Sequence, residues 1–329
     1  MPALLTVHLR RHGRHWLVLL GLLIVLELVL HVAMPEPVHT YFYGLGGEDW
    51  AEDPELFWVP VFGFADPLAK AERAASERLI YAFGGSILTN HKASTNFPDE
   101  LAPRLPGWTV ANFATGGYTS HQSLVLFRRV SAQRIPAVVI ASHAFNDRGP
   151  GFAPDREMAA RNHRPEVKAL YWLSRSKIVQ AWRRVMWRLM GYSPYAVNPQ
   201  HPNVKRRVPL PEFTENLQAF VAETARIGAR LVFCSQASLD PAVGEQTRPY
   251  FAVMQTLADA NQHVFYFDVQ PVVFEAYRRR LGFVPVFPTD QAELLLLHKD
   301  VCHYNDAGHL LIADHLTAFL KAEGIADAN

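Results

Sequence analysis

The stretch DVCHYNDAGH, residues 300–309, places an aspartate and a histidine three positions apart, just before a short apolar helix pattern. Such a pair can act as a base, because the histidine takes up a proton while the carboxylate fixes its tautomer and stabilises the imidazolium. The Gly-Gly-Ser turn at residues 84–86 supplies a hydroxyl, and we expect Ser86 to open a helix whose N-terminus favours developing negative charge. Ser86, His303 and Asp300 are therefore candidates for a nucleophilic triad.

Two further blocks contain hydrogen-bond donors for an oxyanion. In NFATGGYTS, residues 112–120, Gly116 and Gly117 have no side chain that would shield their backbone N–H groups, so these groups are accessible to an oxyanion. In SHAFNDRG, residues 142–149, the amide of Asn146 is a further donor. Each block alone has a plainer interpretation as a glycine turn, an Asx turn or a helix cap. Their order along the chain favours the chemical interpretation.

The surrounding chain alternates short apolar strands with amphipathic helices. Strands are expected at 78–85, 108–114, 136–144, 229–236 and 263–269, and helices at 119–133, 212–227, 248–261 and 306–322. Near-continuous apolar strands separated by helices imply a parallel sheet that is covered on both faces. Ligands of such sheets bind at the carboxyl ends of the strands. The candidate residues follow the first three strands or precede the last helix.

The order Ser, Gly, Asn and then Asp-x-x-His resembles the SGNH hydrolases, the GDSL-like esterase, lipase and acyltransferase superfamily, over about residues 78–322. The resemblance implies an α/β fold, a flavodoxin-like three-layer α/β/α sandwich with a central parallel five-stranded sheet. It implies that Ser86 is the nucleophile, His303 the general base and Asp300 the carboxylate that orients the histidine. The N–H groups of Ser86 and Gly117 and the side chain of Asn146 would form the oxyanion hole.

Two positions depart from the family's pattern. The first block is GGS rather than GDS, and Ala144 stands where the family usually has glycine. The extra methyl group of Ala144 could narrow the pocket or tilt the neighbouring asparagine. We expect Cys302, beside the histidine, to be a bystander, because a packed small residue is commoner than a second nucleophile.

Composition excludes several classes of protein. The 329 residues are 49% hydrophobic and 19% charged, which predicts a folded chain with a substantial core. With a formal net charge of +1, the protein has no strong overall positive electrostatic potential that would attract nucleic acid. Two cysteines exclude a disulfide framework, and no Cys/His cluster has zinc-ligand spacing, so we expect no metal and no cofactor.

The N-terminal segment is expected to anchor the chain in a membrane. A basic front, RRHGR at residues 10–14, precedes an apolar run from Trp16 to Met34. This run just reaches the roughly 20 residues that a spanning helix needs. The positive flank predicts a cytoplasmic N-terminus and a periplasmic or otherwise extracytoplasmic remainder. A cleaved signal peptide is the competing interpretation, although 31–33 is a poor cleavage site. Glu27, inside the span, could mark a membrane partner or could simply lie near the outer interface.

We expect three parts: an N-terminus and anchor at 1–34, a tether or irregular strap at 35–75, and a hydrolase-like domain at 76–329 with an insert at about 148–210. The insert is rich in aromatic and basic residues: Trp172, Trp182, Trp187, Arg175, Arg183, Arg184 and Arg188. This composition predicts a lid, a carbohydrate-stacking surface or a basic amphipathic segment on anionic lipid, with an ordinary peripheral helix as the plain alternative. HPNVKRRVPLP, residues 201–211, is expected to be an exposed loop.

Together these features predict a serine esterase that cleaves small O-acyl groups, acetyl foremost, from cell-envelope or exported carbohydrate through an acyl-serine intermediate. An O-acyltransferase acting on the same polysaccharide would use the same residues. A lipid esterase or thioesterase is the nearest rival, and a non-catalytic scaffold in an export complex is the alternative from another class. The expected partners are an acylated carbohydrate or lipid substrate and the membrane, but no nucleic acid.

Overall fold

The computed structural model describes residues 2–33, 50–60, 63–89, 93–151, 153–167, 205–297 and 300–326, with 173, 176–179, 181–182 and 185 inside the insert. The chain forms two compact units. The first comprises Met1–Ala51 and Ala160–Ala196, and the second comprises Glu52–Ala159 and Val197–Asn329. The part boundaries expected from the sequence stay a prediction.

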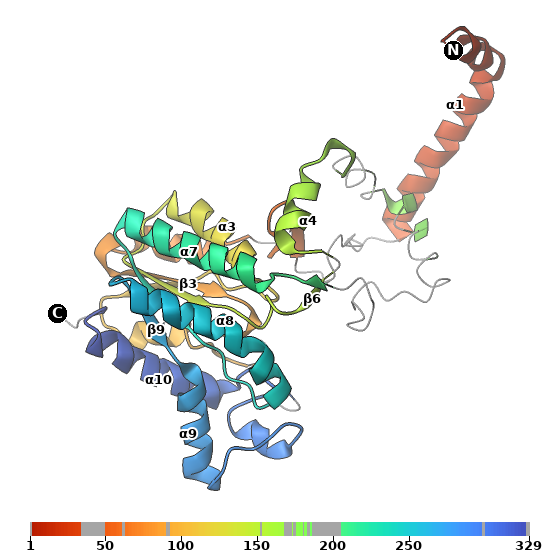
Figure 1. Ribbon diagram of the computed structural model, residues 1–329. Helices are drawn as coiled ribbons and strands as arrows, with labels where there is room; N and C mark the ends of the chain where they lie inside the picture. The colour runs from red at the N-terminus through yellow and green to blue at the C-terminus, as the bar shows by residue number, and fades with distance from the viewer. Residues whose placement is uncertain are drawn as a thin grey trace. The chain divides into compact units, whose positions relative to one another are not determined.

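A parallel five-stranded sheet forms the centre of the second unit (Figure 1). Its strands are β3 (Leu79–Gly84), β4 (Thr109–Asn112), β5 (Val138–Ser142), β8 (Arg230–Cys234) and β9 (Val264–Phe267). They lie in the order β4-β3-β5-β8-β9, and every neighbouring pair is parallel. Strands β3 and β5 are buried along their whole length, which explains why their sequences are continuous apolar runs. All five predicted strands are confirmed.

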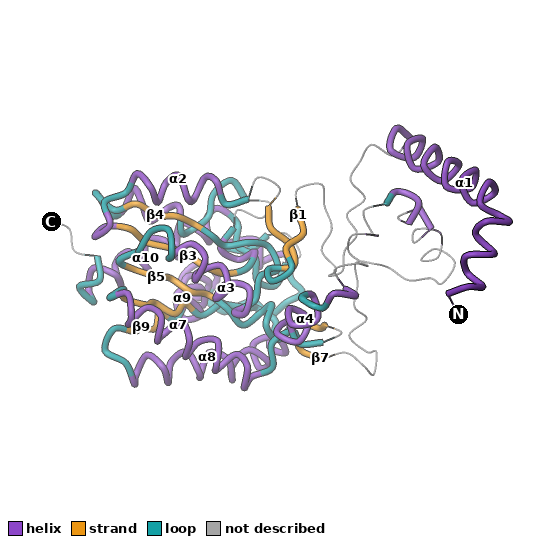
Figure 2. The backbone as a smooth tube through the Cα atoms, turned by 90° about the horizontal axis from the view of Figure 1, so that it is seen from above, coloured by secondary structure: helices purple, strands orange, loops and turns teal. Residues whose placement is uncertain are grey.

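Helices cover both faces of the sheet, so the predicted three-layer architecture is confirmed (Figures 1 and 2). One face carries α3 (Ser120–Ser131), α7 (Leu210–Ile227) and α8 (Pro241–Ala260), and the other carries α9 (Val269–Leu281), α10 (Asp306–Ala322) and the 3-10 helix η3 (Asp99–Arg104). On the first face Phe127 packs between Phe83 and Phe220, with ring centroids 5.5 and 5.4 Å apart. On the second face Ile312 and Leu316 of α10 join the buried cluster.

Two helices differ from the sequence-based expectation because of their caps. Helix α8 begins at Pro241 rather than near 248, since the Asp240 side chain accepts a hydrogen bond from the Ala242 N–H and proline suits the first helical position. Helix α9 was not predicted at all. Asp268 directly follows β9 and caps α9 in the same way, by accepting from the Gln270 N–H.

The segment predicted as a strap contains regular structure in its described part. It forms β1 (Trp50–Asp53), β2 (Phe57–Pro60) and α2 (Ala65–Arg73). Asp53 receives two hydrogen bonds from Arg129 of α3, at 2.7 and 3.1 Å, and two from backbone N–H groups that follow it. These bonds fix Asp53 to α3, and Trp58 of β2 is buried.

The first unit contains the helix α1 (Pro2–Ala33), whose residues His15–Ala33 are long and apolar enough to cross a bilayer. Of the aromatic and basic residues singled out in the insert, Trp182 alone is described, and the remaining six lie outside the described residues. The boundary between the two units lies inside α4 (Asp155–Asn162), between Ala159 and Ala160. The two-residue strands β6 (Pro150–Gly151) and β7 (Lys205–Arg206) pair antiparallel at the edges of the insert.

Candidate active site

Ser86, His303 and Asp300 lie side by side, although the serine is 217 residues from the histidine in sequence. The Ser86 hydroxyl is 2.7 Å from Nε2 of His303, and Nδ1 of the same ring is 2.8 Å from Oδ2 of Asp300. With Nδ1 protonated, the ring donates to the carboxylate and Nε2 accepts from the hydroxyl. The side chains are therefore arranged as a relay that can remove the serine proton.

Asp300 is fixed by more than the histidine ring. Its Oδ1 accepts hydrogen bonds from the backbone N–H groups of His303 and Cys302, at 2.8 and 2.9 Å. Burial by itself would raise the pKa of Asp300, but the His303 ring and these two N–H groups outweigh it and hold the pKa well below its usual range. The carboxylate therefore stays ionised and keeps the imidazole in one orientation.

Cys302 does not compete with the serine. Burial and the neighbouring Asp300 raise the pKa of the Cys302 thiol well above its usual range, so the thiol stays protonated and is a weak nucleophile. Its Sγ lies 3.8 Å from Nδ1 of His303, the nitrogen that already faces Asp300. These contacts agree with the bystander role that was expected.

The turn before the serine explains the first departure from the family's pattern. Ser86 begins the 3-10 helix η2 (Ser86–Leu88) with Gly85 at its N-cap, so the expected longer helix is a single turn and its dipole contributes little. A Cβ atom at Gly85 would lie 2.1 Å from Nδ2 of Asn146 and 3.3 Å from the Tyr118 carbonyl oxygen. Glycine at position 85 therefore lets the asparagine amide approach the serine.

Asn146 reaches this position from the end of β5. Strands β3 and β5 pair at their carboxyl ends, Gly84 against Ser142, and the order of the sheet reverses between them, which is where ligands bind in such sheets. One Nδ2 hydrogen of Asn146 is donated to the Tyr118 carbonyl oxygen, 3.0 Å away. Among the described residues the second hydrogen has no acceptor, so it can be donated to an oxyanion.

The turn that carries Asn146 contains the second departure. Ala144 is fully buried and has φ +127°, in the region that favours glycine. Buried Asp147 holds this conformation by accepting from the N–H groups of Ala144 and Ser120, at 3.1 and 2.8 Å. The alanine therefore strains the backbone of the turn, and it does not prevent the asparagine from reaching Gly85.

Trp58, which the sequence did not single out, orients the glycine pair after β4. Its indole N–H donates to the Gly116 carbonyl oxygen at a distance of 3.0 Å. A trans peptide points its C=O and N–H in opposite directions, so this bond also sets the direction of the Gly117 N–H. Gly117 has φ +77°, which favours glycine. In the described part of the chain, the N–H groups of Ser86 and Gly117 have no hydrogen-bond acceptor.

Arg207 holds the next peptide of the same loop. Its guanidinium donates to the Gly117 carbonyl oxygen at 2.6 Å, to Gln122 at 2.7 Å and to both carboxylate oxygens of Asp155, and it stacks over the Trp58 ring at 5.3 Å. Of the described part of the segment predicted as an exposed loop, Lys205 and Arg206 are exposed but form β7, Arg207 is partly buried and Val208 is fully buried. No local motif marks Trp58 or Arg207, because their roles arise from contacts between distant segments.

The ligand atoms of Asp300, Cys302 and His303 lie within 4.8 Å of one another, which is close enough to consider a metal ion. Both ring nitrogens of His303 are already directed at Ser86 and Asp300. The geometry therefore fits a proton relay better than a metal centre. The absence of a cofactor stays a prediction.

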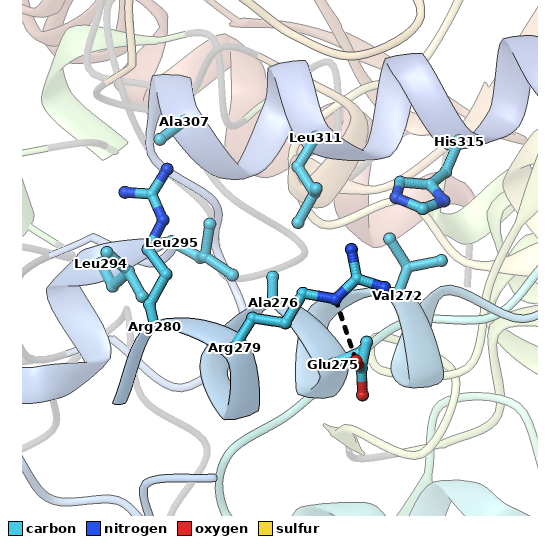
Figure 3. A pocket seen from close by; sticks show the side chains of 10 residues that line it. All are labelled: Val272, Glu275, Ala276, Arg279, Arg280, Leu294, Leu295, Ala307, Leu311 and His315. Carbon is cyan, nitrogen blue, oxygen red and sulfur yellow. Dashed lines mark hydrogen bonds and ion pairs between the residues drawn. The ribbon is translucent and has the colours of Figure 1, made fainter. Parts of the chain in front are cut away.

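A cavity of about 240 Å³ lies elsewhere, between α9 and α10 (Figure 3). Val272, Leu294 and Leu311 line its apolar floor, and Arg279 on its rim bonds to Glu275 at 2.9 Å. None of the triad residues lines this cavity, so it is separate from the candidate active site.

No protein-family profile and no curated protein sequence matches the chain. Solved structures do resemble it. An α/β hydrolase from the metagenome of Lake Arreo, Spain, is 18% identical, with a TM-score of 0.45 over 78% of this chain and 100% of its own. An acetylxylan esterase from Geobacillus stearothermophilus is 16% identical, with a TM-score of 0.44 over 78% and 100%. A lipase/acylhydrolase from Enterococcus faecalis is 15% identical, with a TM-score of 0.44 over 74% and 96%. Likenesses of this degree assign neither a reaction nor a substrate to this chain.

Proposed function

We propose that the protein is a serine-dependent ester hydrolase of the SGNH type. The observation that carries this proposal is the continuous relay from Ser86 through His303 to Asp300, with contacts of 2.7 and 2.8 Å. A fold alone would not need this arrangement. Ser86 follows β3, and His303 and Asp300 share the loop before α10. Together they supply the nucleophile, the base and the group that orients the base.

The reaction follows from the geometry. Nε2 of His303 takes the Ser86 proton while Oγ attacks the ester carbonyl carbon, and Asp300 stabilises the imidazolium that forms. The N–H groups of Ser86 and Gly117 and the Asn146 amide stabilise the negative oxygen of the tetrahedral intermediate. Collapse of this intermediate breaks the ester bond, His303 returns the proton to the leaving alcohol, and an acyl-serine remains. Water, activated by the same histidine, then releases the acid.

As substrate we propose a small acyl ester, acetyl foremost, on cell-envelope or exported carbohydrate. The support for this choice is the extracytoplasmic position that the N-terminal segment predicts for the hydrolase-like unit. The apolar helix His15–Ala33 follows a basic segment, which favours a cytoplasmic N-terminus and an extracytoplasmic hydrolase-like unit. An enzyme held there meets acylated glycans of the envelope.

The test uses the full-length protein in detergent, as wild type, Ser86→Ala and Ser131→Ala. Ser131, the last residue of α3, is partly exposed, lies outside the candidate active site and serves as the matched serine control. We expect a serine-reactive phosphonate to label wild type and the Ser131 variant but not the Ser86 variant, and p-nitrophenyl acetate hydrolysis to follow the same pattern. Labelling that survives Ser86→Ala, or no labelling of wild type, would contradict the proposed mechanism.

The substrate is tested separately with acetylated polysaccharide and with a long-chain p-nitrophenyl ester. Faster release from the acetylated polysaccharide supports the carbohydrate proposal. Preference for the long chain would instead identify a lipid esterase. Appearance of the acyl group on an added sugar acceptor, without a matching amount of free acid, would identify an acyltransferase that uses the same triad.

A further inference from the structure

The carboxylate of Glu27, inside the apolar span of α1, is bonded to the insert. It accepts hydrogen bonds from the Ser176 hydroxyl at 2.8 Å and from the backbone N–H groups of Lys177 and Ile178, at 2.6 and 3.0 Å. Residues 177–179 are helical, so the carboxylate satisfies donors at the start of this turn. The partner of Glu27 in this structure is therefore another segment of the same chain.

The contact occurs within the membrane-spanning length. With a rise of about 1.5 Å per residue, Glu27 lies about 9 Å before the end of α1 at Ala33. Among residues 15–33, Glu27 and Leu30 alone are partly covered, and they lie three positions apart on one face of the helix. The covered face thus includes the carboxylate that is bonded to the insert, and the other residues of the span are exposed.

The insert exposes large apolar side chains next to this contact. Leu173, Trp182 and Val185 are 49, 62 and 55% exposed. They flank residues 176–179, which are fixed to the span through Glu27. Hydrocarbon can cover such side chains, and tryptophan is favoured where a membrane meets water.

We propose that the described residues of this part of the insert, 173, 176–179, 181–182 and 185, are seated in the lipid bilayer beside α1. Their exposed apolar side chains are covered by acyl chains, and the turn at 176–179 is held by Glu27. A carboxylate inside a bilayer must have its hydrogen bonds satisfied by protein, and the insert provides three. We favour lipid over a second copy of the chain as the group that covers these side chains. The Glu27 carboxylate, which could otherwise join the membrane helices of two copies, is already bonded to the insert of its own chain. The protein then has two membrane contacts, the spanning helix and the insert.

The experiment measures membrane depth at single cysteines in the full-length protein, reconstituted in phosphatidylcholine vesicles. The background carries Cys234→Ala and Cys302→Ala. An environment-sensitive fluorophore is attached at Trp182→Cys or, with the tryptophan retained, at Val185→Cys. Val29→Cys on the open side of α1 reports full lipid exposure, and Arg248→Cys on the exposed side of α8 reports water.

We expect a blue-shifted emission at positions 182 and 185 and quenching by lipids that carry a nitroxide on the acyl chain, as at position 29 and unlike position 248. Adding Glu27→Ala should reduce the quenching at 182 and 185 and leave it unchanged at 29. Quenching at 182 and 185 no stronger than at 248 would overturn the proposal. A blue shift without lipid quenching would do the same, because it would show that protein covers the segment. Quenching that is indifferent to Glu27→Ala would overturn the role assigned to this carboxylate.

Discussion

Replacing Trp58 with phenylalanine removes the hydrogen bond that orients the Gly116–Gly117 peptide. The ring remains, so its edge-on packing against Tyr118, at 5.8 Å between centroids, is largely kept. The lost bond, 3.0 Å long, is worth about 1 kcal/mol net. If the Gly117 N–H is less well oriented towards the oxyanion by that amount, kcat falls about fivefold. Complete loss of one oxyanion donor, about 10²–10³-fold in kcat, is the upper limit.

The assay is steady-state hydrolysis of p-nitrophenyl acetate. We expect the effect in kcat with KM almost unchanged, because the oxyanion forms after the substrate binds. The matched control is Trp108→Phe, since the buried indole N–H of Trp108, at the amino end of β4, has no hydrogen-bond partner in the described residues. A Trp58→Phe enzyme with wild-type kcat, or an equal loss in Trp108→Phe, would refute the reasoning.

Three further changes test the turns around the triad and the core beneath them. Gly85→Ala places a methyl group 2.1 Å from Nδ2 of Asn146, so the displaced amide should lower kcat by about 10²-fold with little change in thermal stability; an unchanged kcat would contradict the role given to the asparagine. Ala144→Gly relieves the backbone strain at φ +127° and should raise the free energy of unfolding by about 1 kcal/mol in urea titrations, whereas a marked decrease would show that the conformation is not strained. Burial lowers the pKa of His143 to about 3, and neither ring nitrogen has a hydrogen-bond partner in the described structure. Between pH 6.5 and about 3 the unfolded chain therefore binds a proton that the folded chain does not, and this residue should make the protein up to about 5 kcal/mol less stable as the pH falls through that window. His143→Leu should remove this part of the acid sensitivity, measured as the difference in unfolding free energy between the two proteins at each pH; a difference that does not vary with pH would contradict it.

The sheet could be predicted because each of its strands is an apolar run set off by turn residues. Strand β5, for example, is buried on both faces and reads as VVIAS. Helix α9 was missed because its cap, Asp268, directly follows a strand and its apolar residues merge with that strand in the sequence. Hydrophobic periodicity predicts helices and strands, but it does not show where a strand passes directly into a helix without a loop.

The triad side chains could be chosen from the sequence because each lies beside a turn or helix start with a recognisable pattern. Trp58 and Arg207 could not, since their effect depends on carbonyl groups of Gly116 and Gly117 that only the folded chain brings to them. The partner of Glu27 is a similar case, 149 residues away in the sequence. Contacts between distant segments therefore account for what the sequence left unassigned at the site and at the membrane helix.

The central claim is that Ser86 forms a covalent intermediate whose oxyanion is bound by three donors. A crystal structure of the protein inhibited with an alkyl phosphonate tests this claim most directly. We predict phosphorus bonded to Oγ of Ser86, with one phosphoryl oxygen within hydrogen-bonding distance of the N–H groups of Ser86 and Gly117 and of Nδ2 of Asn146. Phosphorus on another residue, or a phosphoryl oxygen directed away from these donors, would contradict it.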